Sequence, residues 1–215
     1  YVMWFTFLPL TLIGKLFSIS SVLTYSFTLL SIDILLTFIL FKLFINRELE
    51  ILYLYWLSPI VFIGTYIFGL NDLVPIFFLV LSLFLLKKLY FTISGFILMA
   101  AISAKISILI SLPIFLIYFI NNSRIRNFII SFLKGIFIGF IIFIAPFLLS
   151  ESGINMILNN PEVQKIYTFS FDFGNDTKIY FVHLLYLVML YNAWRVKRLN
   201  YDLFYAMLGI TFFIV

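Results

Sequence analysis

Residues 58–88 read SPIVFIGTYIFGLNDLVPIFFLVLSLFLLKK, and the pattern of this stretch decides the fold. A first apolar run ends at a polar turn that closes with Asp72, and a second apolar run continues to Lys87. Asp is a favoured residue just before a helix, and Pro75 suits a first helical turn. The stretch therefore predicts two apolar helices that run in opposite directions and meet at a short polar turn.

The rest of the chain repeats this alternation of apolar runs and short polar gaps. Hydrophobic residues make up 64% of its 215 residues and aromatic residues make up 21%. The mean hydropathy is +1.18. A soluble protein of this size needs far more polar surface than this composition supplies. We therefore expect an all-α, polytopic transmembrane helical bundle.

About eight or nine apolar runs approach the length of roughly 20 residues, and at least about 17, that a membrane-spanning helix needs. These runs cover residues 21–45, 50–68, 73–88, 89–104, 106–120, 127–148, 179–194 and 200–215, with 5–20 as a further span or half-buried segment. They are expected to form a single transmembrane domain over residues 1–215. Because the chain begins at Tyr1 and ends within an apolar run at Val215, we expect it to be a fragment of a longer protein.

The composition also argues against several kinds of site. The sequence has no cysteine, which removes disulfides and thiolate metal sites. It has one histidine and no cluster of His, Asp and Glu at ligand spacing, which argues against a histidine-based transition-metal centre. The net charge of +5 is the topogenic signal expected of a membrane protein, so nucleic acid is not expected as a partner.

The distribution of charge predicts an orientation in the membrane. Ten of the 14 Lys and Arg residues fall in four polar gaps that lie on one side when every run between them crosses once. The ten are Lys42, Arg47, Lys87, Lys88, Arg124, Arg126, Lys134, Arg195, Lys197 and Arg198. By the positive-inside rule this side is cytoplasmic. We therefore expect a multi-pass protein of the plasma membrane or endoplasmic reticulum, with Asp72, Lys105 and a loop over residues 150–178 on the outer or luminal side.

The predicted outer loop, residues 150–178, is the only long polar segment and is rich in turn-forming glycine, proline and asparagine. Its aromatic residues alternate with mostly polar ones at Tyr167, Phe169, Phe171 and Phe173. A period of two fits a short strand, but we expect a loop whose aromatic side chains lie at the membrane interface.

The residues best suited to chemistry lie at two consecutive outer turns. Asp72 follows Asn71 in the first turn, and Lys105 lies between apolar flanks in the second. A carboxylate there can take a proton from an attacking hydroxyl, and an ammonium can neutralise a leaving phosphate. Structural roles stay open as well, with Asp72 as the cap of the next helix and Lys105 as a lysine that reaches the membrane surface from a helix end.

Two further polar residues lie within apolar runs. Asp33 is near the middle of its run, where an isolated charge is costly, so it is expected to face the interior and to be paired or protonated. His183 lies near the outer end of its run. It is either a hydrogen-bonded structural residue or a donor to an anionic lipid head group.

The run SPIVFIGTYIFGLND, followed by ISGFILMAAISAKISILISLPIFLIYF, resembles the GT-C superfamily of integral membrane glycosyltransferases, which use polyprenyl-phosphate-linked sugars. Asp33 matches an Asp often found in an upstream helix of that family. The other matching positions are Gly69 and Asp72 of a G-Q-x-D turn, in which Leu70 replaces Gln, and Gly95, Lys105 and Pro113 of a G-x-x-x-G-hydrophobic-K-x-x-P helix pair. The resemblance covers roughly residues 1–150 and implies a GT-C-like fold.

The resemblance implies a mannosyltransferase-like enzyme that moves a sugar, mannose or another hexose, from a polyprenyl-phosphate donor to a glycan, lipid or protein acceptor on the outer face. The family's principal catalytic carboxylate lies upstream of Tyr1, so the fragment alone is expected to be inactive. Candidates for substrate binding are Asp72, Asn71, Lys105 and His183, and Asp72 is also a candidate catalytic residue. Membrane lipid is an expected partner, a divalent metal on the donor phosphate stays open, and no other cofactor is implied.

Two other function classes fit the same sequence. A transporter or flippase of lipid-linked oligosaccharides would favour polar residues at the membrane midplane and helices that are broken there. An outer-face polysaccharide polymerase or ligase would favour basic residues in the long outer loop, but this loop holds only Lys165 and Lys178 against four carboxylates.

Overall fold

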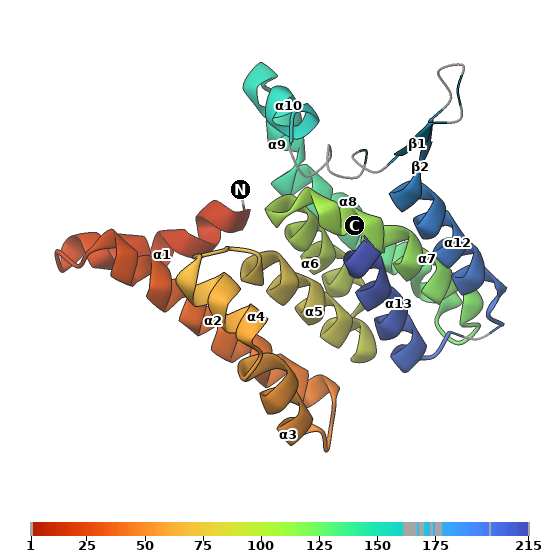
Figure 1. The fold of residues 1–215 in the computed structure, drawn as a ribbon, viewed down its shortest axis with the longest axis horizontal. Coiled ribbons are helices and arrows are strands. Elements are labelled where there is room, and N and C mark those ends of the chain that lie inside the picture. Colours follow the sequence, from red (N-terminus) through yellow and green to blue (C-terminus); the bar gives the residue numbers. More distant parts are fainter. Residues whose placement is uncertain are drawn as a thin grey trace. The chain divides into compact units, whose positions relative to one another are not determined.

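The computed structural model describes residues 2–160, 167, 170–172, 174, 178–197 and 199–214. These residues are mostly helical, with one antiparallel sheet of two short strands (Figure 1). The predicted all-α class is confirmed. The chain groups into two compact units, Tyr1–Lys105 with Phe132–Ile144, and Ile106–Ser131 with Ala145–Val215. The single transmembrane domain over residues 1–215 stays a prediction.

The first unit contains one helix of 23 residues, several shorter helices and a helix pair that is broken at Ser58. Its elements are α1 (Val2–Leu16), α2 (Ser21–Leu43), α3 (Glu48–Ile51), the π-helix η1 (Leu52–Trp56), α4 (Pro59–Phe62), the π-helix η2 (Ile63–Ile67), α5 (Leu73–Lys87), α6 (Phe91–Ala104) and most of α8 (Ile129–Phe143). The segments Glu48–Trp56 and Pro59–Ile67 are bent by 52° relative to one another, and we call them the bent pair. Pro59 begins the second segment, as suits a residue without a backbone N–H.

The second unit contains the C-terminal helices and the sheet. Its elements are the 3-10 helix η3 (Ile106–Ser111), α7 (Leu112–Asn121), the 3-10 helix η4 (Arg126–Phe128), α9 (Ala145–Leu148), α10 (Glu151–Leu158), β1 (Ser170–Asp172), β2 (Lys178–Tyr180), α12 (Phe181–Arg195) and α13 (Tyr201–Ile214). Helices therefore occupy all the apolar runs identified in the sequence.

The lengths of these helices bear on the number of membrane spans. Within the described residues, Ser21–Leu43 and Arg126–Phe143 are each long and apolar enough to cross a membrane, and the bent pair is a third if it counts as one broken span. Four other apolar helices have 10–17 residues. The larger number of spans expected from the sequence, about eight or nine, therefore stays a prediction.

The segment predicted as an outer loop, residues 150–178, contains regular structure in its described parts. Helix α10 occupies its first residues, and β1 pairs with β2 at its end. The alternation at Phe171 therefore marks a strand. At β1 the short strand, and not the loop, is the correct alternative, because its backbone pairs with that of β2. The position of this segment at a membrane interface stays a prediction. Phe169 and Phe173, on which the expectation also relied, lie outside the described residues.

The core of the first unit lies where α2 packs on α5. Ile32 and Leu36, four residues apart and so on one face of α2, are buried against Leu73 and Val74 at the start of α5. Partly buried residues from α1, α2, η1 and α5 surround them, namely Met3, Phe7, Leu40, Tyr55, Phe77, Phe78 and Val80. The start of α5 is therefore fixed by the middle of α2.

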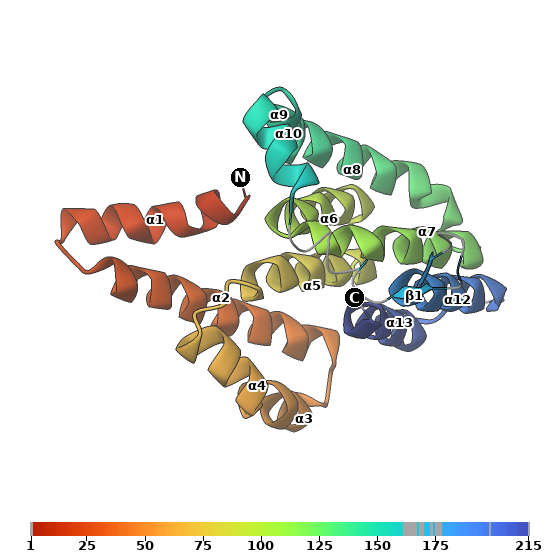
Figure 2. The same cartoon turned by 45° about the horizontal axis from the view of Figure 1, so that its top comes forward.

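Helix α6 packs closely on both α5 and α8 (Figure 2). The hydroxyls of the buried residues Ser82 and Ser94 each donate to the backbone carbonyl of the other residue at 2.8 Å, which joins α5 to α6. Between α6 and α8, a Cβ added to Gly95 or to Gly135 would collide with a backbone carbonyl of the facing helix. Small residues permit such close approach between apolar helices.

Different groups lie at the two ends of the α2–α5 pair. At one end, Lys87 Nζ donates to the carbonyl of Leu43, the last residue of α2, at 2.6 Å. At the other end, the hydroxyl of Tyr25 donates to the carbonyl of Gly69, which precedes α5, at 2.7 Å. The two helices therefore run in the same direction, and Lys87 lies at the opposite end of α5 from Asp72.

In the second unit, α7, α12 and α13 pack together. Phe115 and Phe204 are fully buried, and the ring of Tyr118 stacks on that of Phe204 with 4.4 Å between centroids. Asn121, the last residue of α7, donates through Nδ2 to three carbonyls at the end of α12. These belong to Ala193, Trp194 and Val196, at 3.1, 3.3 and 2.8 Å. The last carbonyls of a helix have no partner within it, so Asn121 closes the end of α12.

Replacing Gly135 with alanine is expected to destabilise the protein, because the new Cβ would meet the backbone of α6, which has no room to move aside. Overpacking of this kind costs about 1–3 kcal/mol. The matched control is Gly209→Ala in α13, where nothing lies within 4 Å of an added Cβ. Thermal unfolding in detergent compares the two variants. Equal unfolding midpoints would contradict the close α6–α8 packing.

Replacing Asn121 with alanine is expected to lower the free energy of unfolding by about 1–2 kcal/mol, because the end of α12 loses its side-chain donor. Asn192→Ala is the control, since the Asn192 amide is exposed and donates only to Val188 of its own helix among the described residues. Denaturant unfolding of both variants provides the measurement. A smaller effect at position 121 than at position 192 would show that α12 needs no such closure.

Candidate functional site

An ion pair joins two helix ends of the first unit. Lys105 Nζ lies 2.8 Å from Asp72 Oδ1. Asp72 immediately precedes α5, and Lys105 immediately follows α6. Because these helices pack side by side in opposite directions, the start of one lies beside the end of the other (Figure 2). The structure thus brings together the two residues that the sequence analysis placed at consecutive outer turns.

The side chain of Asp72 is used for this ion pair and not to cap α5. The residue itself has helical angles, with φ −61° and ψ −19°, and its side chain makes no capping hydrogen bond. The structural role expected for Asp72 is therefore wrong. Its position still suits its charge, because a helix start favours an anion and the end of α6 favours the cation of Lys105.

The turn before α5 holds Asp72 in place through its backbone. Gly69 has φ +64°, a conformation that glycine adopts without steric cost, and its carbonyl accepts the hydrogen bond from Tyr25. Asn71 is exposed, and its carbonyl accepts a hydrogen bond from the backbone N of Val74 at 3.1 Å. Asn71 thus lies beside the ion pair in the chain, with its amide side chain accessible.

The exposure of the ion pair decides what it can do. The Lys105 side chain is 26% exposed and that of Asp72 is 47% exposed. A pair so accessible contributes only about 1 kcal/mol or less, so a competing anion can displace one partner. A phosphate that binds Lys105 would release the carboxylate of Asp72, which is then able to accept a proton. Lys105 can therefore exchange its ion pair with Asp72 for an ion pair with a bound phosphate.

His183 belongs to the second unit, on the first turn of α12. Its ring centroid lies 5.0 Å from that of Tyr167 and 5.6 Å from that of Tyr180. Within the described part of the chain, its buried Nδ1 has no hydrogen-bond partner. Ring packing, and not a hydrogen bond at this nitrogen, is therefore the contact that the structure gives His183.

Asp33 lies in the middle of α2 and is 3% exposed. The hydroxyl of Tyr55 in η1 donates to Oδ1 at 2.5 Å, and the hydroxyl of Tyr66 in η2 donates to Oδ2 at 2.6 Å. One donor therefore comes from each half of the bent pair. The prediction that Asp33 faces the interior with a partner is confirmed. The two tyrosines were not identified from the sequence, although a carboxylate within an apolar run is itself a signal that donors must lie nearby.

A metal ion on a donor phosphate would need ligands, and oxygen ligands are what a divalent cation of that kind prefers. Among the described residues, no three His, Asp or Glu side chains are grouped as metal ligands. Asp72, whose Oδ1 lies 2.8 Å from Lys105 Nζ, would be the carboxylate of this ion pair available to such an ion.

Comparison with known proteins gives no relative for this chain. No protein-family model, no curated protein and no solved structure matches it.

Proposed function

We propose that the chain is the membrane-embedded part of a GT-C-type glycosyltransferase. It moves a sugar, mannose or another hexose, from a polyprenyl-phosphate donor to an acceptor at the outer face of the membrane. The observation that carries the proposal is the accessible Asp72–Lys105 pair, a carboxylate and an ammonium 2.8 Å apart at the end of α5 opposite Lys87.

The pair supports a direct displacement at the sugar. The donor phosphate binds Lys105 in place of Asp72, so the ammonium neutralises the negative charge that grows on the phosphate as the sugar–oxygen bond breaks. The acceptor oxygen forms the new bond to the same sugar carbon, and its proton passes to a carboxylate. Asp72 is the candidate in this chain, beside a principal carboxylate expected upstream of Tyr1. Polyprenyl phosphate leaves with its charge held by Lys105.

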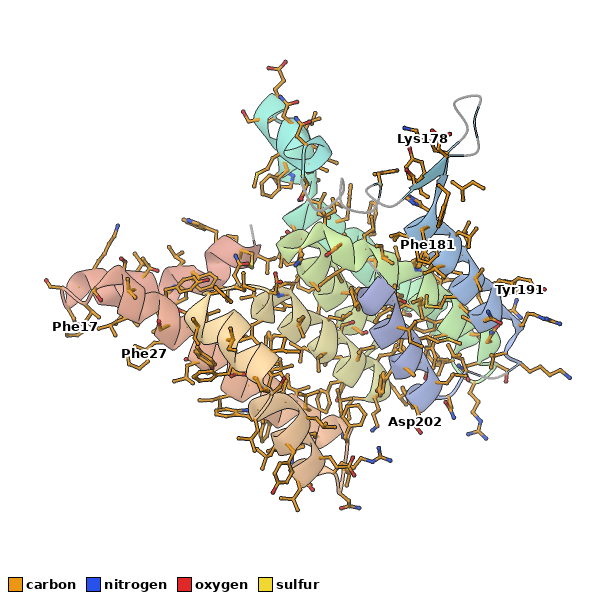
Figure 3. All side chains as sticks on the ribbon, viewed as in Figure 1. Phe17, Phe27, Lys178, Phe181, Tyr191 and Asp202 are labelled. Atoms are coloured by element: carbon orange, nitrogen blue, oxygen red, sulfur yellow. The ribbon has the colours of Figure 1, made fainter. Side chains whose placement is uncertain are left out.

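The membrane setting of this proposal draws support from the surface of the helices. Large apolar side chains are exposed on α1, α2, α8 and the bent pair. Phe27 of α2 is 57% exposed, and Phe17, which follows α1, is 73% exposed; both are labelled in Figure 3. Exposing such apolar side chains to water is unfavourable, whereas exposing them to the hydrocarbon of a membrane is not. We propose a multi-pass protein in which the Lys87 end of the first unit is cytoplasmic and the Asp72 end is external or luminal.

A transporter or flippase for a lipid-linked sugar is the second candidate. Asp33 and the bent pair favour it, because buried ionisable residues beside broken helices are a feature of transporters. Transport would need no chemistry at Asp72 and Lys105. The two candidates therefore differ in whether sugar transfer is lost when that pair is altered.

Lys105→Met in the complete protein is expected to weaken donor-lipid binding or turnover at least tenfold, or about 1.4 kcal/mol, because the phosphate loses its cation. Lys15→Met, at an exposed lysine in the last turn of α1, removes the same charge and should change neither. Binding of a polyprenyl phosphate to the purified protein and transfer of labelled sugar are the measurements. An equal loss of donor binding and turnover in both variants would show that any positive charge on the protein has this effect, and would contradict a specific role for Lys105.

The proposed orientation predicts that Lys87, Arg124 and Arg195 are cytoplasmic and that Asp72 and Lys105 are external, as is Asn175, which lies outside the described residues. The chain has no cysteine, so single cysteines at these positions form a clean labelling series. An impermeant thiol reagent applied to intact cells should label only the external set. Labelling of Arg124→Cys from outside would reject the orientation.

A further inference from the structure

The bent pair is fastened to the middle of α2 around one buried carboxylate. We propose that Asp33, Tyr55 and Tyr66 form a clamp that positions Asp72 against Lys105. The inference rests on the proposed function only where it treats the Asp72–Lys105 pair as the functional site. The clamp itself is a statement about how the first unit holds that pair.

Three side chains of the bent pair converge on a single turn of α2. Tyr55 and Tyr66 each donate to one oxygen of the Asp33 carboxylate. Trp56 Nε1 donates at 2.5 Å to the hydroxyl of Thr37, which in turn donates at 2.9 Å to the carbonyl of Asp33. Both halves of the bent pair are therefore tied to one point, on either side of the break at Ser58.

The hydrogen bonds to Asp33 form in apolar surroundings. Asp33 is not in an ion pair with any described residue, and the residues of α1 and α5 in the adjacent core are apolar. The charged residues of α5 and α6 lie at the helix ends, at Asp72, Lys87, Lys88 and Lys105. Hydrogen bonds in a site with little water are stronger than those exposed to water, and losing one leaves a buried polar group unpaired.

The bent pair buries little apolar surface, so the hydrogen bonds of the clamp are its main attachment to α2. Among residues 48–67, Ile51 and Thr65 alone are buried, whereas Leu54, Leu57 and Ile60 are each more than half exposed. Two of the four segments are π-helices, which are rare and frequently lie at functional sites. Without the clamp, we expect the bent pair to separate from α2.

A short stretch of backbone with several hydrogen bonds connects the clamp to Asp72. After Tyr66, the backbone N of Phe68 donates to the carbonyl of Ile63 at 2.9 Å, and the backbone N of Leu70 donates to that of Gly64 at 3.0 Å. The carbonyl of Gly69 accepts from Tyr25 of α2. A displacement of η2 is therefore passed to the turn that carries Asp72.

Thiol cross-linking of the cysteine-free chain tests the clamp without any sugar substrate. Asp72→Cys with Lys105→Cys reports on the site, and Leu43→Cys with Lys87→Cys reports on the opposite end of the same helices. Both pairs are treated with dibromobimane in lipid vesicles. The backgrounds are wild type, Tyr55→Phe, Tyr66→Phe and Asp33→Asn, and the control background is Tyr53→Phe, which removes the same hydroxyl from an exposed tyrosine of η1.

The clamp predicts that Tyr66→Phe and Asp33→Asn slow cross-linking of the 72–105 pair by about fivefold or more, the factor expected from losing one such hydrogen bond. The 43–87 pair and the Tyr53→Phe background should react as in wild type. An unchanged 72–105 rate in all three clamp variants would overturn the inference, as would an equal fall at both pairs, which denotes general loosening. Selective slowing in a protein that binds no donor lipid would reject the proposed function and retain the clamp.

Discussion

The first unit depends on one constraint, which is that polar groups among apolar helices must find their partners inside the protein. Asp33 takes its two donors from the bent pair, and Ser82 and Ser94 satisfy one another between α5 and α6. Apolar surfaces alone pack in many ways, because any apolar contact is nearly as good as another. Each internal hydrogen bond excludes many of those alternatives, and together these bonds favour one placement of the helices.

The helix positions and the neighbourhood of Asp72 and Lys105 were predictable from the sequence. Apolar runs separated by polar gaps predict helices here, because a helix satisfies its backbone hydrogen bonds within its own segment. Every second turn of an up-and-down array lies at the same end by geometry, so the turns that carry Asp72 and Lys105 were expected to be neighbours. The contact at 2.8 Å is the detail that the structure adds.

Other features depend on contacts between segments far apart in sequence. The partners of Asp33 lie 22 and 33 residues away, and nothing in the local pattern selects Tyr55 and Tyr66 from the other tyrosines. The side chain of Asp72 pairs with Lys105 and does not cap α5. The sequence of one turn does not show that a cation from another turn lies within reach. Gly135 and Gly139 have the spacing G-x-x-x-G in an apolar helix, and this signal could have identified the face of α8 that contacts α6.

The α5–α6 hairpin has a consequence for the order of assembly. Its two helices are consecutive in the chain and contact each other along their length, whereas α8 reaches α6 only after the chain has passed through η3, α7 and η4. Local contacts form before distant ones because less chain entropy is lost in closing them. We therefore expect the ion pair at the open end of the hairpin to form early in this region, before α8 packs on α6.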